Sequence, residues 1–328
     1  MVNKMVYGGC IMLRRNFIPA TIMLIIGLFL SKPDIVSEGA AIGLKIWVNN
    51  IVPFLFPMSV LSNILLQYNF LYSMSGRLSF ISGKILKTDY GLIPFFISFV
   101  SGYPSGAMTV NTMAESGKIS NREANYLTIF ANNCSFQFIA GAVSFSMLDN
   151  FHLLKYIALP HFVGAVLLSF LINTGKSKLS PSKIIQLKPV PFHKNFSSSI
   201  YKSVTGILTV GGVIVTFSVF SNFLKDSLLS LANAFSLSTQ MTNIIYSLLV
   251  GLLEMTNGCN IMASSPVVPL EIKLIIINFI ISFSGMSVIF QTIAITDKFD
   301  LDIKNYILLK LVHGIFSSLL CIIMLIFT

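Results

Sequence analysis

The stretch GLIPFFISFVSGYPSGAMTVNTMAESGK, residues 91–118, decides the fold. Its apolar part is interrupted by SGYPSG at 101–106. Each remaining piece, of about 12 residues, would reach about 18 Å at the helical rise per residue, too short for a hydrocarbon core of roughly 30 Å. The stretch therefore predicts a re-entrant hairpin, which enters a membrane and leaves it on the same side.

The composition supports a membrane environment. Of the 328 residues, 54% are hydrophobic and 10% are charged, whereas a soluble domain of this length needs more polar surface. Inside lipid only helices or a closed barrel satisfy the backbone hydrogen bonds. Apolar runs such as IIYSLLVGLL at 244–253 are continuous and do not alternate. We therefore expect an all-α polytopic membrane protein.

Several function classes are disfavoured. The net charge of +10 lies in short segments between apolar runs, so it indicates topology and lipid headgroups and argues against nucleic acid as a partner. No nucleotide-binding, metalloprotease or hydrolase motif occurs, so we expect no enzyme, no ATP-driven pump and no cofactor beyond a coupling proton or Na⁺. The cysteines lack metal-ligand spacing and are expected to be packing residues in a reduced compartment: Cys10, Cys134, Cys259 and Cys321.

Lysines set the expected topology. Residues 173–202 carry six lysines and no acid, so the positive-inside rule places this loop in the cytoplasm, together with the basic N-terminus. The N-terminus could also be a secretory signal, but no clear cleavage site follows, and we expect an uncleaved first helix. The chain must then cross the membrane an even number of times between the two.

About seven transmembrane helices meet this constraint and leave the C-terminus outside. Residues 36–50 are expected to form a separate surface or re-entrant helix. The second broken segment contains EMTNG and then SSP, and it predicts a second re-entrant hairpin. The expected helices lie at about 14–31, 51–69, 122–148, 153–173, 203–224, 271–296 and 305–327, and the hairpins at 90–117 and about 241–268.

The two halves of the chain resemble each other. SVLSNIL at 59–65 matches SVFSNFL at 218–224 in five of seven positions. A shift of 152 residues pairs later positions, among them Gly106 with Gly258 and His161 with His313. Partner segments run in opposite directions in the expected topology, so we expect two inverted repeats. The expected division is an N-terminal transmembrane helix at 1–35, a first repeat at 36–175, a basic cytoplasmic loop at 176–198 and a second repeat at 199–328.

The two broken segments carry the candidate site, because paired breaks in inverted halves indicate binding near the bilayer midplane. In the first, Pro104 can begin a half-helix whose free N–H groups suit an anionic or carbonyl-bearing ligand; a kink sealed by serines is the alternative. In the second, Glu254 could bind a proton or Na⁺, donate to a substrate when protonated, or lie at an interface in water. The candidate substrate-binding residues are Ser101, Gly102, Tyr103, Pro104, Ser105, Gly106, Asn132, Asn133, Glu254, Thr256, Asn257 and Gly258.

Other polar residues fall within the expected spans. Asn132 and Asn133 interrupt the helix at 122–148 and could line a cavity or clamp the hairpins. His161 and His313 could relay protons, although packing between helices is favoured. Lys310, near the start of the last helix, is expected to snorkel towards water.

Residues 101–143 resemble the YlbJ-type sporulation integral membrane proteins, which have a similar SGYP-x-GA break, a Glu-containing helix start, paired asparagines and a helix ending in GAV. Here these are residues 101–107, Glu123, Asn132 with Asn133, and residues 141–143. The resemblance covers nearly the whole chain. It implies membership of the nucleoside-recognition Gate group, related to concentrative nucleoside transporters, and hence inverted repeats with two re-entrant hairpins.

The resemblance also implies a role in endospore formation and spore cortex development, with movement of dipicolinic acid across the outer forespore membrane. A secondary transporter for a small anionic metabolite is the favoured function. A nucleoside transporter and a non-transporting membrane scaffold are the alternatives, and a scaffold does not need a polar midplane in both halves. The expected partners are a small-molecule substrate and the lipid bilayer.

Overall fold

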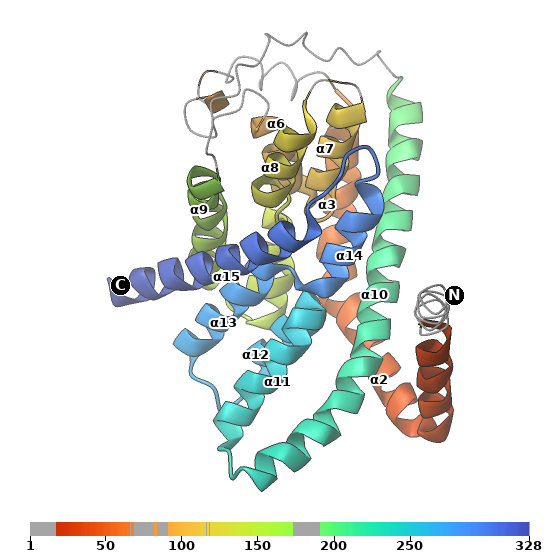
Figure 1. Ribbon diagram of the computed structural model, residues 1–328, viewed down its shortest axis with the longest axis vertical. Helices are drawn as coiled ribbons and strands as arrows, with labels where there is room; N and C mark the ends of the chain where they lie inside the picture. The colour runs from red at the N-terminus through yellow and green to blue at the C-terminus, as the bar shows by residue number, and fades with distance from the viewer. Residues whose placement is uncertain are drawn as a thin grey trace, which may run out of the picture.

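The computed structural model describes residues 18–65, 91–115, 119–172 and 191–327, together with residues 67, 68, 80, 82, 83 and 117. All regular structure within these residues is helical, which confirms the all-α prediction. The basic N-terminus, Cys10 and most of the lysine-rich loop lie outside the described residues. Figure 1 shows α10 (Phe192–Ala234) running along one side of the molecule, while α15 (Ile303–Ile326) lies across it.

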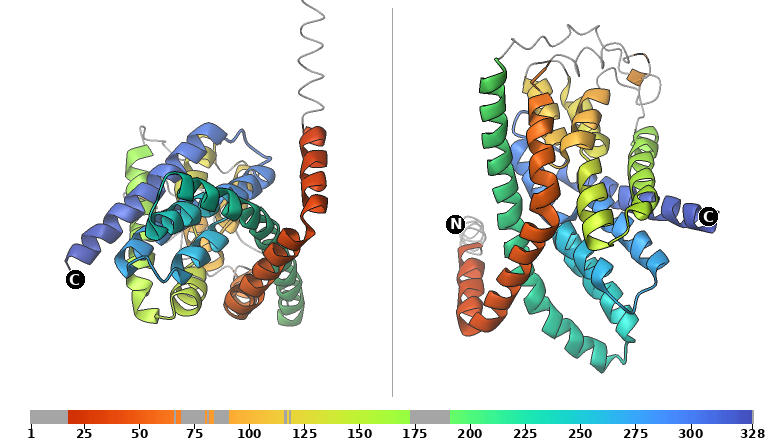
Figure 2. Two further views of the ribbon diagram at one scale, coloured as in Figure 1. Left: turned by 90° about the horizontal axis from the view of Figure 1, so that it is seen from below. Right: turned by 180° about the vertical axis from the view of Figure 1, so that it is seen from behind.

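The helix that follows the first bend is longer than expected. The helix Ile18–Ser31 meets the next one at 96°. The chain then continues without interruption through three elements that Figure 2 shows alongside α10. The expected separation between a surface helix at 36–50 and a spanning helix from residue 51 is therefore wrong. The three elements are α2 (Pro33–Ile46), the π-helical η1 (Trp47–Ile51) and α3 (Val52–Leu65).

Two glycines bring α2 against the backbone of α10. A Cβ atom on Gly39 would lie 2.8 Å from Val219 Cα, and one on Gly43 would lie 2.7 Å from Val215 Cα. Only glycine permits this approach, as in other small-residue helix crossings. Helix α10 itself begins at Phe192, inside the expected loop at 176–198, and extends well beyond the expected span of 203–224.

The first half holds a pair of short helices, a broken helix and a long one. The expected helix at 122–148 is not continuous, because residues 132–135 leave helical geometry and the second piece is π-helical. The elements are α6 (Leu92–Ser101), α7 (Ser105–Glu115), α8 (Asn121–Ala131), η2 (Phe138–Met147), η3 (Phe151–Leu153) and α9 (Leu154–Ile172).

The second half has a similar order. The expected helix at 271–296 is also interrupted, here at Ser284, whose φ is +77°. The break at Glu254 and the end near SSP lie where the sequence predicted them. The elements are α11 (Thr239–Leu253), α12 (Met255–Ser264), α13 (Leu270–Phe283), α14 (Gly285–Ile295) and finally α15.

Helix ends recur at the predicted shift of 152 residues. Helix α6 ends at residue 101 and α11 at residue 253, and 101 + 152 = 253. Likewise α8 ends at residue 131 and α13 at residue 283, and 131 + 152 = 283. The breaks therefore occupy equivalent positions, which supports the proposed repeat; its inverted relation remains a prediction.

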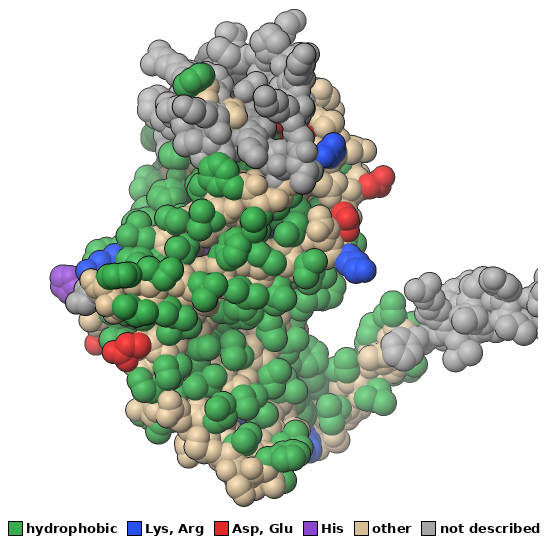
Figure 3. Space-filling model, turned by 60° about the vertical axis from the view of Figure 1, so that its left-hand side comes forward, with side chains coloured by type: hydrophobic (Ala, Val, Ile, Leu, Met, Phe, Trp, Pro, Cys, Tyr) green, Lys and Arg blue, Asp and Glu red, His purple; other side chains and the backbone are tan. Residues whose placement is uncertain are grey.

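Within the described residues, four helices are long and apolar enough to cross a membrane, or up to five if the bent pair is one span. Large apolar side chains are exposed on them, for example Leu208 at 55% and Leu319 at 50%. In Figure 3 hydrophobic side chains are spread over most of the visible face and charged ones occur in few places. This surface fits lipid better than water. The count of seven spans stays a prediction.

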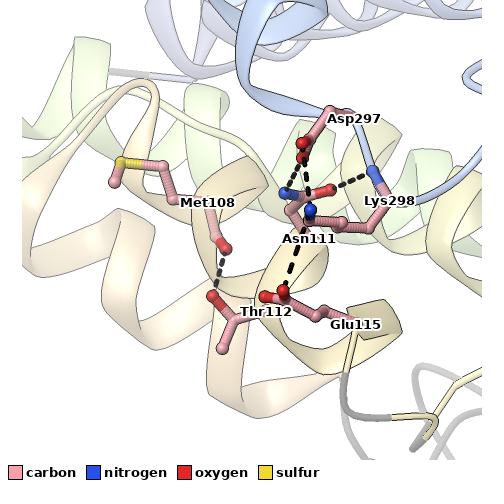
Figure 4. A network of polar contacts seen from close by, with 6 residues as sticks. All are labelled: Met108, Asn111, Thr112, Glu115, Asp297 and Lys298. Atoms are coloured by element: carbon pink, nitrogen blue, oxygen red, sulfur yellow. Dashed lines mark hydrogen bonds and ion pairs between the residues drawn. The ribbon is translucent and has the colours of Figure 1, made fainter.

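The loop between α14 and α15 is tied to the first half (Figure 4). The Asn111 side chain in α7 donates to Asp297 Oδ1 at 2.8 Å and accepts from the Lys298 N–H at 3.0 Å. The Lys298 ammonium lies 3.7 Å from the Glu115 carboxylate. Asn125 in α8 holds the same loop, donating to the Asp300 carbonyl oxygen at 2.7 Å. The ends of α7 and α8 therefore share one end of the molecule with this loop.

Candidate functional site

The turn between α6 and α7 consists of Gly102, Tyr103 and Pro104. Gly102 has φ +76°, which disfavours any other residue, and a Cβ atom there would lie only 3.1 Å from Ser135. The Tyr103 hydroxyl donates to the Ile281 carbonyl oxygen at 3.2 Å. The first predicted break is thus joined directly to α13 of the second half.

Ser98 joins α6 to the break after α8. Its hydroxyl donates to the Asn133 carbonyl oxygen at 2.8 Å and lies 2.5 Å from the Asn133 nitrogen. The Asn133 side-chain oxygen and the Ser101 hydroxyl are buried without a hydrogen-bond partner among the described residues. Buried polar atoms are normally paired, so these two atoms could bond a polar ligand.

Asn132 connects three helices through its side chain. Its amide oxygen accepts from the Ala107 N–H at 3.3 Å, near the start of α7. Its amide nitrogen donates to Thr292 Oγ1 at 3.0 Å and to the Tyr306 hydroxyl at 3.1 Å. These contacts are those of a clamp, one of the two roles expected for this residue. They also show that one N–H group at the start of α7 is already bonded by the protein.

Lys310 lies at the same junction, and the expectation that it snorkels is wrong. Its side chain is fully buried, its ammonium donates to the Asn132 carbonyl oxygen at 2.5 Å, and it lies 5.3 Å from the centroid of the Tyr103 ring. A signal in the sequence could have identified it, because buried polar residues recur at helical spacing on one face of α15. These are Tyr306, Lys310, His313, Ser317 and Cys321.

The two repeat-related histidines contact each other. Their ring centroids are 5.0 Å apart, and His313 Nε2 lies 2.8 Å from the His161 carbonyl oxygen. His161 Nδ1 lies 2.7 Å from Ser282 Oγ, and its Nε2 accepts from the Cys134 N–H at 3.2 Å. The arrangement is the packing between helices that the sequence favoured.

Glu254 forms the second break and is 3% exposed, which excludes the wet-interface alternative. It caps α12, since Oε1 accepts from the Thr256 N–H at 2.9 Å and Oε2 from the Asn257 N–H at 2.7 Å. A carboxylate at a helix N-terminus is stabilised by the helix dipole. The first N–H groups of α12 are therefore occupied by the protein's own anion.

Asn257 and Gly258 fasten α12 to its neighbours. The Asn257 side chain accepts from Ser218 Oγ at 2.8 Å and donates to the Ile214 carbonyl oxygen at 3.2 Å, both in α10. Gly258 lies against the backbone of Gly251 in α11, too close for any side chain. Gly106 is similar, because a Cβ atom there would lie 2.6 Å from the Ala131 carbonyl oxygen. Both glycines therefore have a packing role.

The structure brings most of the predicted residues to two adjoining junctions. Residues of the first break, Asn132 and Asn133 form one, and Glu254, Thr256, Asn257 and Gly258 form the other. Cys134 and Cys259, both free thiols, belong to one buried cluster between them, against which Tyr103 and Met255 pack. Pro104 and Ser105 are half-buried at the first turn. The structure adds residues that the sequence did not select as binding residues, among them Lys310, Ser98 and Tyr306.

These features define a helical membrane protein whose broken helices meet at a buried polar centre. The chain is similar to the sporulation integral membrane protein YlbJ of Bacillus subtilis (strain 168), with 27% identity over 318 residues, 88% of this chain and 77% of the relative. The match supports the resemblance to YlbJ-type membrane proteins. No family model matches the chain. No solved structure matches it significantly.

Proposed function

We propose that this protein acts in sporulation as a secondary transporter that moves a small anionic metabolite across a membrane. The similarity to a sporulation integral membrane protein supports the setting. The observation that carries the transport proposal is the pair of breaks at Gly102 and Glu254, which are 152 residues apart and lie within buried polar networks. Discontinuous helices in equivalent halves are how many transporters build a midplane site.

Polar groups in the centre argue for transport over a scaffold. A scaffold can be held together by apolar packing, and a buried polar network costs free energy unless every member is bonded. Here Ser101, Asn133 and Ser287 each bury a side-chain atom without a partner among the described residues. Such atoms are expected where a polar solute passes.

The substrate proposal rests on the YlbJ-type resemblance. It implies dipicolinic acid, the outer forespore membrane, and the Gate group with its relation to nucleoside transporters. A small planar dicarboxylate has two anionic groups for donors such as Lys310 and the Ser101 hydroxyl. Glu254 would repel it unless a coupling proton or Na⁺ accompanied that carboxylate. A nucleoside, the alternative substrate, carries no charge for Lys310 to bind.

Reconstitution tests the proposal. Purified protein in liposomes is expected to take up labelled dipicolinate faster than protein-free liposomes and faster than it takes up uridine. Uridine uptake without dipicolinate uptake would favour the nucleoside alternative. Uptake of neither solute, with and without gradients of protons and Na⁺, would leave the scaffold as the better description.

A further inference from the structure

Lys310 is a basic side chain that the protein buries without an acidic partner among the described residues. Among the described residues its ammonium contacts the Asn132 carbonyl oxygen and the face of the Tyr103 ring, and neither is an anion. Within the described part of the chain no carboxylate pairs with it. A buried ammonium without a counter-ion is costly, so an anion that reached this position would stabilise the protonated form of the side chain.

Glu254 does not serve as that counter-ion. Both of its oxygens accept hydrogen bonds from the N–H groups of Thr256 and Asn257. The carboxylate of the second break is therefore held by the start of α12, and Lys310, which contacts the first break from α15, has no ion-pair partner among the described residues.

The repeat makes the asymmetry clear. The shift of 152 residues pairs Lys310 with Ala158 and Glu254 with Gly102. Each charge thus has an uncharged equivalent in the other half, although the helix ends around them coincide. Both repeats contain the helix breaks, whereas Lys310 and Glu254 each occur in only one of them. These two residues therefore make the two sides of the polar centre chemically different.

The contacts of Lys310 also hold its ammonium in place. Asn132 belongs to the break after α8 and Tyr103 to the turn before α7, so groups from two breaks converge on one lysine of α15. Two buried side-chain atoms without a partner among the described residues lie nearby in the chain. The Asn133 side-chain oxygen belongs to the residue after Asn132, and the Ser101 hydroxyl belongs to the residue before Gly102 and Tyr103. The basic group of Lys310 therefore contacts the same two breaks that hold these unused hydrogen-bonding atoms.

We propose that Lys310 is the residue that binds the anionic group of the transported solute and thereby selects anions over neutral molecules. This inference rests on the proposed transport function. The ammonium supplies the counter-charge, and the Asn132 carbonyl and Tyr103 ring position it.

Paired ligands test the charge directly. Dipicolinate and its neutral diamide, pyridine-2,6-dicarboxamide, have the same planar shape and differ in charge. Binding of each to the protein in lipid nanodiscs gives a preference ratio. Lys310→Met, which is one atom shorter, stays unbranched and removes the charge, is expected to lower the preference for the dicarboxylate by about tenfold or more, since hydrogen bonds to charged groups are among the stronger ones.

Two further variants separate charge from structure. Lys310→Gln keeps a donor for the Asn132 carbonyl oxygen without the charge, and it is expected to lose the preference as Lys310→Met does. Lys273 offers a matched control because its ammonium also donates to a backbone carbonyl, that of Ala263, at 2.8 Å. Lys273→Met is expected to leave the ratio unchanged. A merely structural role for Lys310 would weaken both ligands equally and leave the ratio intact.

Each outcome decides between the two proposals. If the wild type transports dipicolinate and a folded Lys310→Gln or Lys310→Met protein keeps the full preference, the role of Lys310 is wrong and the transport proposal stands. If the wild type itself binds the diamide as tightly as the dicarboxylate, charge selection is wrong without any variant. If the wild type neither binds nor transports either ligand, the proposed transport function is wrong, and the role of Lys310, which rests on it, is wrong as well.

Discussion

His161 and His313 are 152 residues apart in the sequence and in direct contact, with ring centroids 5.0 Å apart and His313 Nε2 at 2.8 Å from the His161 carbonyl oxygen. Two residues related by a two-fold axis lie at equal distances on opposite sides of it, so they can touch only when both are close to that axis. The contact therefore supports an axis between α9 and α15. Gly164 permits the approach, because a Cβ atom there would lie 3.3 Å from the His313 ring.

An inverted repeat makes a prediction about sidedness. The start of α8 and the α14–α15 loop should face the cytoplasm, and the α12–α13 loop the opposite side. A membrane-impermeant maleimide should label Asn121→Cys and Asp300→Cys from one side of oriented vesicles and Pro266→Cys from the other. With Cys10 replaced by serine, the remaining native cysteines, Cys134, Cys259 and Cys321, are buried and should give little background. Labelling of all three variants from one side would contradict the topology.

Glu254→Gln should leave the protein folded and change the proton or Na⁺ dependence of transport. The amide keeps one acceptor for the start of α12 but loses the negative charge that the helix N-terminus stabilises. Glu254→Ala removes both acceptors and should destabilise the helix by about 1 kcal/mol as a lost cap. Flux measured across pH and Na⁺ concentration checks the coupling role. Identical profiles for wild type and Glu254→Gln would argue against it.

Gly106→Val should lower the amount and thermal stability of folded protein. Its Cβ atom would lie 2.6 Å from the Ala131 carbonyl oxygen and 2.9 Å from Asn132 Cα, so α7 must move, at a cost of about 1–3 kcal/mol for overpacking. Any loss of transport should then follow the loss of folded protein. Gly206→Val is the matched control, because no described atom beyond the adjacent backbone of its own helix lies within 4 Å of its Cβ position. A stable Gly106→Val protein with no substrate binding would instead restore a direct role in ligand binding.

The α14–α15 loop should loosen in acid. The Asn111 amide, and after it Lys298, lowers the pKa of Asp297. A lowered pKa in the folded state means that the contribution to stability is present above the unfolded pKa and is lost as pH falls through the folded value. Hydrogen exchange at residues 297–302, corrected for intrinsic rates, should therefore increase at acidic pH.

Asn111→Ala should increase that exchange already at neutral pH, because it removes two hydrogen bonds to the loop. Asp300→Asn is the control, since Asp300 contacts Asn125 through its backbone carbonyl. Equal exchange in wild type and Asn111→Ala would show that the Asn125 contacts and the Lys298–Glu115 ion pair hold the loop without Asn111.

The breaks at Gly102 and Glu254 could be predicted because glycine, proline and polar residues interrupt apolar runs there. The break at Ser284 could not, since serine rarely adopts a positive φ and no proline accompanies it. The start of α10 was missed because lysine and serine, which suggest a loop, are tolerated on an exposed helix.

The position of Lys310 could not be predicted from its local sequence alone. A lysine eight residues from the end of an acidic loop reads as a flanking residue that reaches water. Its actual partners, Asn132 and Tyr103, are distant in the sequence and meet it only through the two breaks. Periodicity on α15 could have identified the buried face, but not what that face would contact.

The bonds of Asn132 have a consequence for motion. One residue joins α7, α14 and α15 through its side chain and holds Lys310 through its carbonyl oxygen. If α7 slid against α15 by even a fraction of a helical turn, several of these bonds would break in the same event, because they share one rigid amide and its peptide group. Intermediate positions would leave buried polar atoms unpaired and would be sparsely populated. Any exchange between two arrangements of this centre would therefore be all-or-none, with a rate set by the simultaneous rupture of the Asn132 contacts.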